Sequence, residues 1–136
     1  TIFFKKLSNV KKTADCWEAE EKIKDAFYQV DELVGSVLDE WNHWFNLYIK
    51  RLKFEDWDDE QRQASMNQIN PKYVLRNYMS QLAIDAAEEG DFTIVSELYD
   101  LLLKPYEEQL NAEKWFAKRP EWARNKVGCS MLSCSS

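Results

Sequence analysis

The sequence has few of the residues that punctuate turns, with only three Gly and three Pro among its 136 residues. A many-stranded β fold needs a turn roughly every ten residues, so this scarcity argues against one. The composition also excludes collagen-like, low-complexity and disordered chains, because 45% of the residues are apolar. No apolar run approaches the roughly 20 residues of a membrane span, and the opening Thr-Ile-Phe-Phe-Lys-Lys is no signal peptide. We therefore expect no membrane partner.

Residues that commonly carry catalysis or bind metals are also scarce, since His43 is the only His and the three Cys are Cys16, Cys129 and Cys134. The spacing of Cys129 and Cys134 lacks the paired Cys-x-x-Cys pattern of zinc modules, and the isolated glycines form no phosphate-binding loop. A sparse, odd number of cysteines indicates a reducing compartment. We predict no catalytic, cofactor-binding or metal-binding residue in this chain, and we interpret His43 as a rim or core residue.

Basic residues are outnumbered, because 18 Lys and Arg against 24 Asp and Glu give a formal net charge of −6. Residues 13–60 carry fourteen acids against five bases, whereas residues 111–136 carry five bases against two acids. Residues 1–12 carry four Lys and no acid. An acidic body argues against a nucleic-acid partner, and such charge blocks are typical of solvated helix faces.

Helical periodicity is the strongest pattern in the sequence. From Trp17 to Leu52, apolar residues recur at steps of three or four, which predicts one long helix or two helices broken near Gly35. We favour two, because Ser36 can act as an N-cap and Gly suits a helix end. The second helix would carry an aromatic face formed by Trp41, Trp44, Phe45 and Tyr48. Such a face is typical of a core.

Capping signals predict two further helices. Acids at 58–60 open a helix that runs to about Gln68, since they favour the positive end of the helix dipole. The next helix is predicted to begin at Asn70-Pro71, with Asn as the cap and Pro at the first helical position, and to end at Gly90. Its apolar face would consist of Val74, Tyr78, Leu82 and Ala86.

The remaining signals complete an all-α prediction of five or six helices. Asp91 or Thr93 would cap a helix that stops before Pro105, and a helical turn is predicted near residues 111–116. After Pro120 no periodicity remains. We divide the chain into a lead-in segment (1–12), a helical domain (13–118) and an irregular, basic tail with two cysteines (119–136).

The tail contains the candidate redox residues, Cys129 and Cys134. A thiol near a chain end and flanked by Ser and Gly is expected to be exposed, mobile and available for thiol exchange. Arg124 and Lys126 would favour the thiolate form of Cys129. A pair of idle surface cysteines explains the same residues equally well.

Five runs of residues resemble the selenoprotein O family along the chain, most closely from Asn70 onward. These runs are NPKYVLRNY (70–78), AIDAA (83–87), KPY (104–106), KRPEWAR (118–124) and GCSMLSCSS (128–136). Residues 54–70 fit the family more loosely, and residues 14–38 hardly at all. The chain resembles only the helical C-terminal part of that family, so we expect it to belong to a longer protein.

The resemblance implies a parent protein with a kinase-like fold that moves AMP from ATP, with Mg or Mn, onto hydroxyl side chains of other proteins. Family members place their nucleotide and metal ligands in the kinase-like core, which implies that this chain is inert alone. Animal members place selenocysteine third from the end, where this chain has Cys134. The resemblance thus implies a redox role for Cys134, through a contact with the catalytic core or a bridge to a cysteine in it. It also implies a cytoplasmic location in a bacterium, or a mitochondrial one in a eukaryote.

Two other functions remain open from the residues alone. A stand-alone helical interaction module would bury its aromatic faces against a partner helix and leave the tail without a role. A small thiol oxidoreductase is disfavoured, because no Cys at a predicted helix N-terminus has a second thiol close in sequence.

Overall fold

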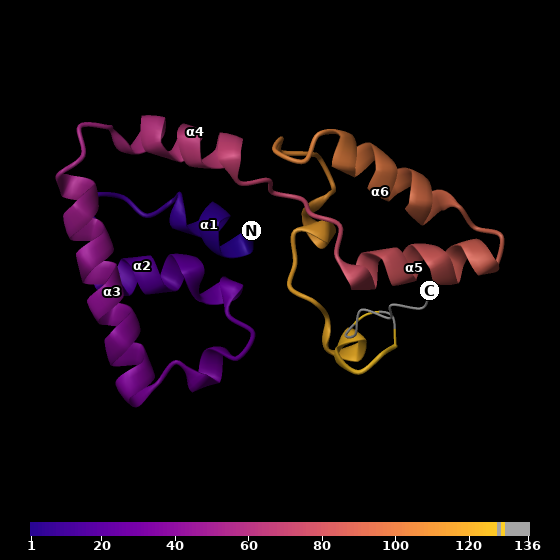
Figure 1. The fold of residues 1–136 in the computed structure, drawn as a ribbon, viewed down its shortest axis with the longest axis horizontal. Coiled ribbons are helices and arrows are strands. Elements are labelled where there is room, and N and C mark those ends of the chain that lie inside the picture. Colours follow the sequence, from indigo (N-terminus) through magenta and orange to yellow (C-terminus); the bar gives the residue numbers. More distant parts are fainter. Residues whose placement is uncertain (128, 130–136) are drawn as a thin grey trace, which may run out of the picture. The chain divides into compact units, whose positions relative to one another are not determined.

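The chain is all-α in the computed structural model, which describes residues 1–127 and 129 (Figure 1). These residues contain six α-helices and no strand, as predicted. The helices are α1 (Ile2–Leu7), α2 (Cys16–Ile23), α3 (Gly35–Lys53), α4 (Asp59–Ile69), α5 (Asn77–Glu88) and α6 (Thr93–Leu103). Four 3₁₀ helices accompany them: η1 (Lys24–Ala26), η2 (Val30–Glu32), η3 (Glu113–Trp115) and η4 (Glu121–Arg124). The chain divides into two compact units, Thr1–Asn70 and Pro71–Ser136.

In the first unit, α2 packs beside α3 (Figure 1). The predicted break near Gly35 is confirmed, because Gly35 has a φ of +55° and begins α3. The expected cap at Ser36 is wrong, since Val34 is the N-cap and makes no side-chain cap hydrogen bond. The first helix also ends earlier than its periodicity predicted, at Ile23, and 3₁₀ turns follow. An extended Phe27 brings its ring to 4.8 Å from that of Trp41, a tertiary contact that competes with helix propagation.

Three of the four residues of the predicted aromatic face of α3 belong to the core of the first unit, whereas the fourth, Trp44, is 37% exposed. Phe45 is 1% exposed, and Trp41 and Tyr48 pack partly buried around it. The first residues of the chain also contribute to this core, because α1 and the turn after it bury Leu7 and Val10. The buried apolar residues of this core are Leu7, Val10, Ala14, Ala19, Ile23, Phe45 and Ile49.

The start of α4 agrees with the sequence prediction. Asp58 is the N-cap and its carboxylate accepts a hydrogen bond from the N–H of Gln61 at 2.7 Å. The Gln61 side chain in turn accepts from the N–H of Asp58, which completes a capping box. Asp59 and Glu60 lie in the first turn, where the helix dipole favours acids.

The helix predicted to begin at Asn70-Pro71 does not begin there. Asn70 is the C-cap of α4, and α5 starts only at Asn77, so Val74 lies on no helical face. The N–H groups of Lys72 and Tyr73 both donate to the carbonyl of Pro105, at 2.8 and 3.0 Å. This long-range contact satisfies two backbone donors that would have no intrahelical partner in the first turn of a helix, and it holds the segment in an irregular conformation.

The second unit contains α5 and α6, which pack against each other. The end of α5 at Gly90 is confirmed by the φ of +87° at that residue. The N-cap of α6 is Phe92 and not the predicted Asp91 or Thr93, although the Asp91 carboxylate accepts from the N–H of Thr93 at 2.8 Å. The helix stops before Pro105 as predicted. Apolar residues from the segment before α5, from both helices and from the later turns form its core, namely Tyr73, Tyr78, Met79, Ala83, Leu98, Leu101, Ala112, Trp115, Ala123 and Cys129.

No helix in the described part of the chain has both the length and the apolar character that a bilayer crossing requires.

Candidate functional site

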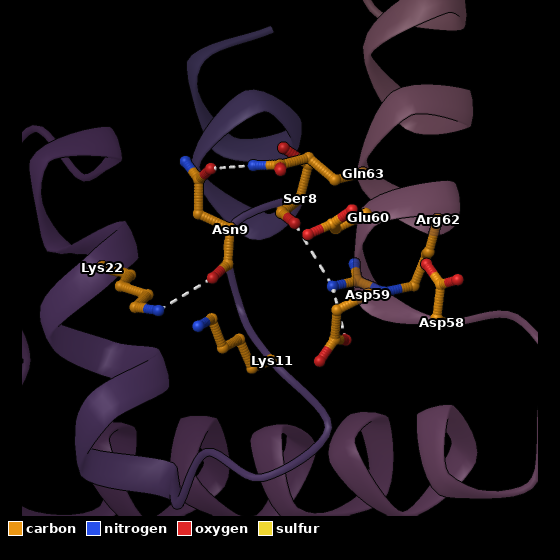
Figure 2. A pocket seen from close by; sticks show the side chains of 9 residues that line it. All are labelled: Ser8, Asn9, Lys11, Lys22, Asp58, Asp59, Glu60, Arg62 and Gln63. Atoms are coloured by element: carbon orange, nitrogen blue, oxygen red, sulfur yellow. Dashed lines mark hydrogen bonds and ion pairs between the residues drawn. The ribbon is translucent and has the colours of Figure 1, made fainter.

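A polar cavity of about 750 Å³ lies in the first unit, between the segment after α1, the end of α2 and the start of α4 (Figure 2). Figure 2 shows Lys22 across the cavity from the acidic first turn of α4. The residues that line it are Ser8, Asn9, Lys11, Lys22, Asp58, Asp59, Glu60, Arg62 and Gln63. Its walls therefore carry charges of both signs.

Arg62 forms the buried wall of this cavity, with only 5% of its surface exposed. Its Nη2 donates to the carbonyl of Ser8 at 3.2 Å, to the carbonyl of Val10, and to the Asp59 carboxylate at 3.3 Å. Its Nη1 lies 3.4 Å from the hydroxyl of Tyr48. One guanidinium thus connects three parts of the first unit: the segment after α1, α3 and α4.

Further hydrogen bonds cross the cavity beside Arg62. The Lys22 ammonium donates to the carbonyl of Asn9 at 2.8 Å, and the Gln63 amide donates to the Asn9 side chain (Figure 2). The N–H of Lys12 donates to both oxygens of Asp59, at 3.1 and 3.2 Å. These bonds join residues far apart in sequence, so the polar groups of the cavity mainly hold the first unit together.

The chemistry available in the cavity is limited by the same bonds. The Ser8 hydroxyl, the only hydroxyl in its lining, donates to the carbonyl of Lys5 at 2.8 Å and approaches Asn67 at 3.3 Å. The hydroxyl of Tyr48, next to Arg62, does not line the cavity. Burial raises its pKa, and the neighbouring Arg62 guanidinium partly opposes that rise. No group of three or more His, Cys, Asp or Glu within residues 1–127 and 129 is arranged to hold a metal ion. The cavity therefore shows a structural network rather than an activated nucleophile.

The cysteines singled out from the sequence lie in different surroundings. Cys134 falls outside the described residues. Cys129 is 5% exposed and belongs to the core of the second unit, so the expectation that it is exposed was wrong. The cause is the packing just before it, where Ala123 is fully buried and the Trp122 ring contacts that of Tyr78 at 6.4 Å. This packing carries the chain back onto the core.

The other sequence candidates are Cys16 and His43. Cys16 is half-buried against the core of the first unit, and it is a free thiol, as is Cys129. His43 is exposed on α3, so the interpretation of a rim residue holds.

A second charged cluster, in the second unit, was missed by sequence reasoning. Lys72 is 6% exposed, and its ammonium donates to Glu108 at 2.5 Å and to Glu113. The same ammonium lies 5.4 and 5.1 Å from the ring centroids of Tyr73 and Phe116. Burial would lower the pKa of Lys72, but the two carboxylates outweigh it and raise the pKa above its usual value. No local pattern predicts this cluster, because its partners lie 36 and 41 residues away.

Comparison with known proteins assigns the chain to a family. The family model described as protein adenylyltransferase SelO matches residues 1–103. The chain belongs to the SelO family. The resemblance to selenoprotein O drawn from the sequence runs is thereby confirmed.

Curated SelO relatives match the whole chain. A protein nucleotidyltransferase YdiU from Flavobacterium johnsoniae is 61% identical over 136 residues, covering 100% of this chain and 26% of the relative. Proteins of the same name from Aromatoleum aromaticum and Rhodopirellula baltica are 46% and 41% identical, and the chain covers 25% and 27% of their lengths. The chain thus spans about a quarter of the SelO relatives that it matches.

Proposed function

We propose that this chain is the helical C-terminal region of a protein adenylyltransferase, which transfers AMP from ATP to Ser, Thr or Tyr hydroxyls of other proteins. The observation that carries the proposal is the match of the whole chain to about a quarter of relatives named protein nucleotidyltransferase. In the proposed reaction, the protein hydroxyl attacks the α-phosphorus of ATP, its proton passes to a base, and pyrophosphate leaves.

The catalytic parts of this reaction are assigned to polypeptide outside this chain. A kinase-like core would bind ATP with Mg or Mn, and this chain would support it as its helical neighbour. Most polar groups of the cavity, among them Arg62, Asp59 and Lys22, are engaged in bonds within the first unit, which suits a supporting role. The proposed setting is the cytoplasm of a bacterium, and the bacterial origin of the relatives named above supports the bacterial part of this proposal.

The proposal is tested with labelled ATP, with Mg or Mn, on three proteins in parallel. These are this chain, the full-length Flavobacterium johnsoniae relative, and a chimera in which this chain replaces the matching segment of that relative. We expect the relative and the chimera to transfer labelled AMP to protein. We expect no transfer by this chain alone. An inactive chimera beside an active relative would contradict the supporting role, and label transferred by this chain alone would contradict the placement of catalysis.

We also propose that the tail makes the parent protein responsive to oxidation, with Cys134 as the reactive residue and Cys129 as a secondary candidate. Cys134→Ser in the chimera is expected to leave helical content unchanged and to alter the response of AMP transfer to oxidant. Cys16→Ser is the matched control, since Cys16 lies in the other unit. An identical oxidant response in the chimera and its Cys134→Ser variant would rule out the redox role.

The alternative is a helical interaction module that acts without AMP transfer. Large apolar side chains that lie exposed favour it, including Trp17 at 65%, Phe54 at 75% and Leu110 at 96% exposure. The chimera distinguishes the two functions. A chain that acts only as an interaction module is not expected to support AMP transfer when it replaces the matching segment of the relative.

A further inference from the structure

A second cavity in the first unit, of about 520 Å³, is lined by four aromatic side chains and one carboxylate. Its volume falls within the roughly 300–1,000 Å³ of ligand sites. Phe3 and Phe4 come from α1, whereas Glu40, Trp41 and Trp44 come from the first half of α3. Aromatic rings around an acid form the kind of site that recognises cations, because the ring faces and the carboxylate both attract positive charge.

The rings of this cavity hold one another in place before any ligand arrives. The Phe3 centroid lies 6.0 Å from both Trp41 and Trp44, and 5.4 Å from Phe4. Trp44 also stacks on Tyr48, at 5.3 Å and 5°. Binding would therefore order few side chains, which favours affinity.

Charge complementarity selects a cation over an apolar occupant. Among the described residues, the exposed Glu40 carboxylate forms no ion pair, and Asp39 beside it is exposed as well. Lys6 of the adjoining α1 already pairs with Asp25 at 3.3 Å. The acid that lines the cavity thus has no ion-pair partner in the described part of the chain. Its own segment, residues 13–60, carries fourteen acids against five bases, whereas residues 1–12, which supply Phe3 and Phe4, carry four Lys and no acid.

An apolar groove of the second unit provides a contrast. It is lined by one aromatic ring and no charged side chain, its residues being Leu75, Ser80, Ala83, Val95, Leu98, Tyr99 and Leu102. That groove has no charged side chain that would favour a cation over an aliphatic group. The aromatic cavity of the first unit has both aromatic rings and a carboxylate.

We propose that the cavity lined by Phe3, Phe4, Glu40, Trp41 and Trp44 is a docking site for a basic protein segment, which inserts an arginine side chain. A guanidinium is planar and weakly hydrated, so it stacks on aromatic rings more readily than an ammonium does. The site stands on these five residues and does not depend on AMP transfer.

The test uses the indole N–H signals of ¹⁵N-labelled chain in an NMR titration with acetyl-Gly-Ser-Arg-Ser-Gly-amide. A peptide with citrulline in place of arginine is the isosteric, uncharged control, and a lysine peptide tests the choice of guanidinium. We expect saturable shifts of Trp41 and Trp44 with the arginine peptide, at least threefold weaker binding of the lysine peptide and none of the citrulline peptide. Trp17 and Trp57, which are exposed and line no part of the cavity, are internal controls that should not move.

A charge variant completes the test. Glu40→Gln is expected to weaken binding of the arginine peptide at least threefold, whereas Glu18→Gln, an equal charge change at an exposed position of α2, should leave it unchanged. Equal binding of the citrulline and arginine peptides would overturn the proposal in favour of an apolar occupant. Full affinity in Glu40→Gln, or equal shifts of all four Trp signals, would overturn it as well.

Discussion

At the scale of single residues, Arg62 is the clearest determinant of stability in the first unit. Its guanidinium serves the carbonyls of Ser8 and Val10 and the carboxylate of Asp59. Replacing Arg62 by Met keeps the aliphatic volume but removes the side-chain donor of the two carbonyls and one of the hydrogen bonds to Asp59, which keeps those from the Lys12 N–H. We expect a loss of about 3 kcal/mol in the free energy of unfolding, measured by urea denaturation followed by circular dichroism.

Arg51→Met provides the matched control for that measurement. Arg51 pairs with Glu55 at 3.1 Å but is 74% exposed, so its loss should destabilise by about 0.5 kcal/mol or less. Similar losses in the two variants would contradict the role given to the buried guanidinium.

Three acids of the second unit predict its response to pH. Hydrogen bonds from Lys126, Thr93 and Lys114 lower the pKa values of Asp85, Asp91 and Glu97 respectively. A carboxyl whose pKa is lower in the folded state adds stability above its unfolded pKa, near 4. That stability is lost as the pH falls through the folded pKa.

The urea midpoint of the second unit should therefore fall between about pH 5 and pH 3, as reported by the fluorescence of Trp115 and Trp122 in a variant without the other tryptophans. Asp85→Asn should reduce this acid sensitivity, because the Asp85–Lys126 pair is then absent at every pH. A midpoint that stays constant over the range would contradict the assignment.

At the scale of elements, Gly90 governs the end of α5. Its φ of +87° lies in a region that residues with a Cβ rarely adopt, although a Cβ at this position would meet no atom within 4 Å. Gly90→Ala should therefore destabilise the second unit by about 1 kcal/mol through backbone strain alone. Gly90→Asn should destabilise it less, because Asn tolerates positive φ, and equal losses in urea denaturation would point to another cause.

Helix positions were predictable where local chemistry decides them. The capping residue Asp58 and the C-terminal Gly90 stand where the sequence placed them. The irregular segment after Asn70 was not predictable from local sequence. The N–H groups of Lys72 and Tyr73 donate to Pro105, which lies more than 30 residues further along the chain. The burial of Cys129 was not predictable for the same reason. Its neighbours in the core come from helices that are distant in sequence.

At the scale of the whole molecule, exposed apolar area predicts the behaviour of the isolated chain. Trp17, Phe54, Tyr99 and Leu110 are each at least 65% exposed, among many others of the same kind. Exposed apolar side chains favour association when they meet complementary apolar surface on another molecule. In sedimentation velocity, the 16.2 kDa chain should form larger species as its concentration rises, and a constant monomer would contradict this.

The arrangement around Arg62 also has a consequence for how the first unit is made. Its bonds to Ser8 and Val10 span 54 and 52 residues, and the contact of Ser8 with Asn67 spans 59. Contacts so distant along the chain slow folding, because a long loop must close before they form. During synthesis, the hydrogen bonds from Arg62 to Ser8 and Val10 can form only after α4 has left the ribosome.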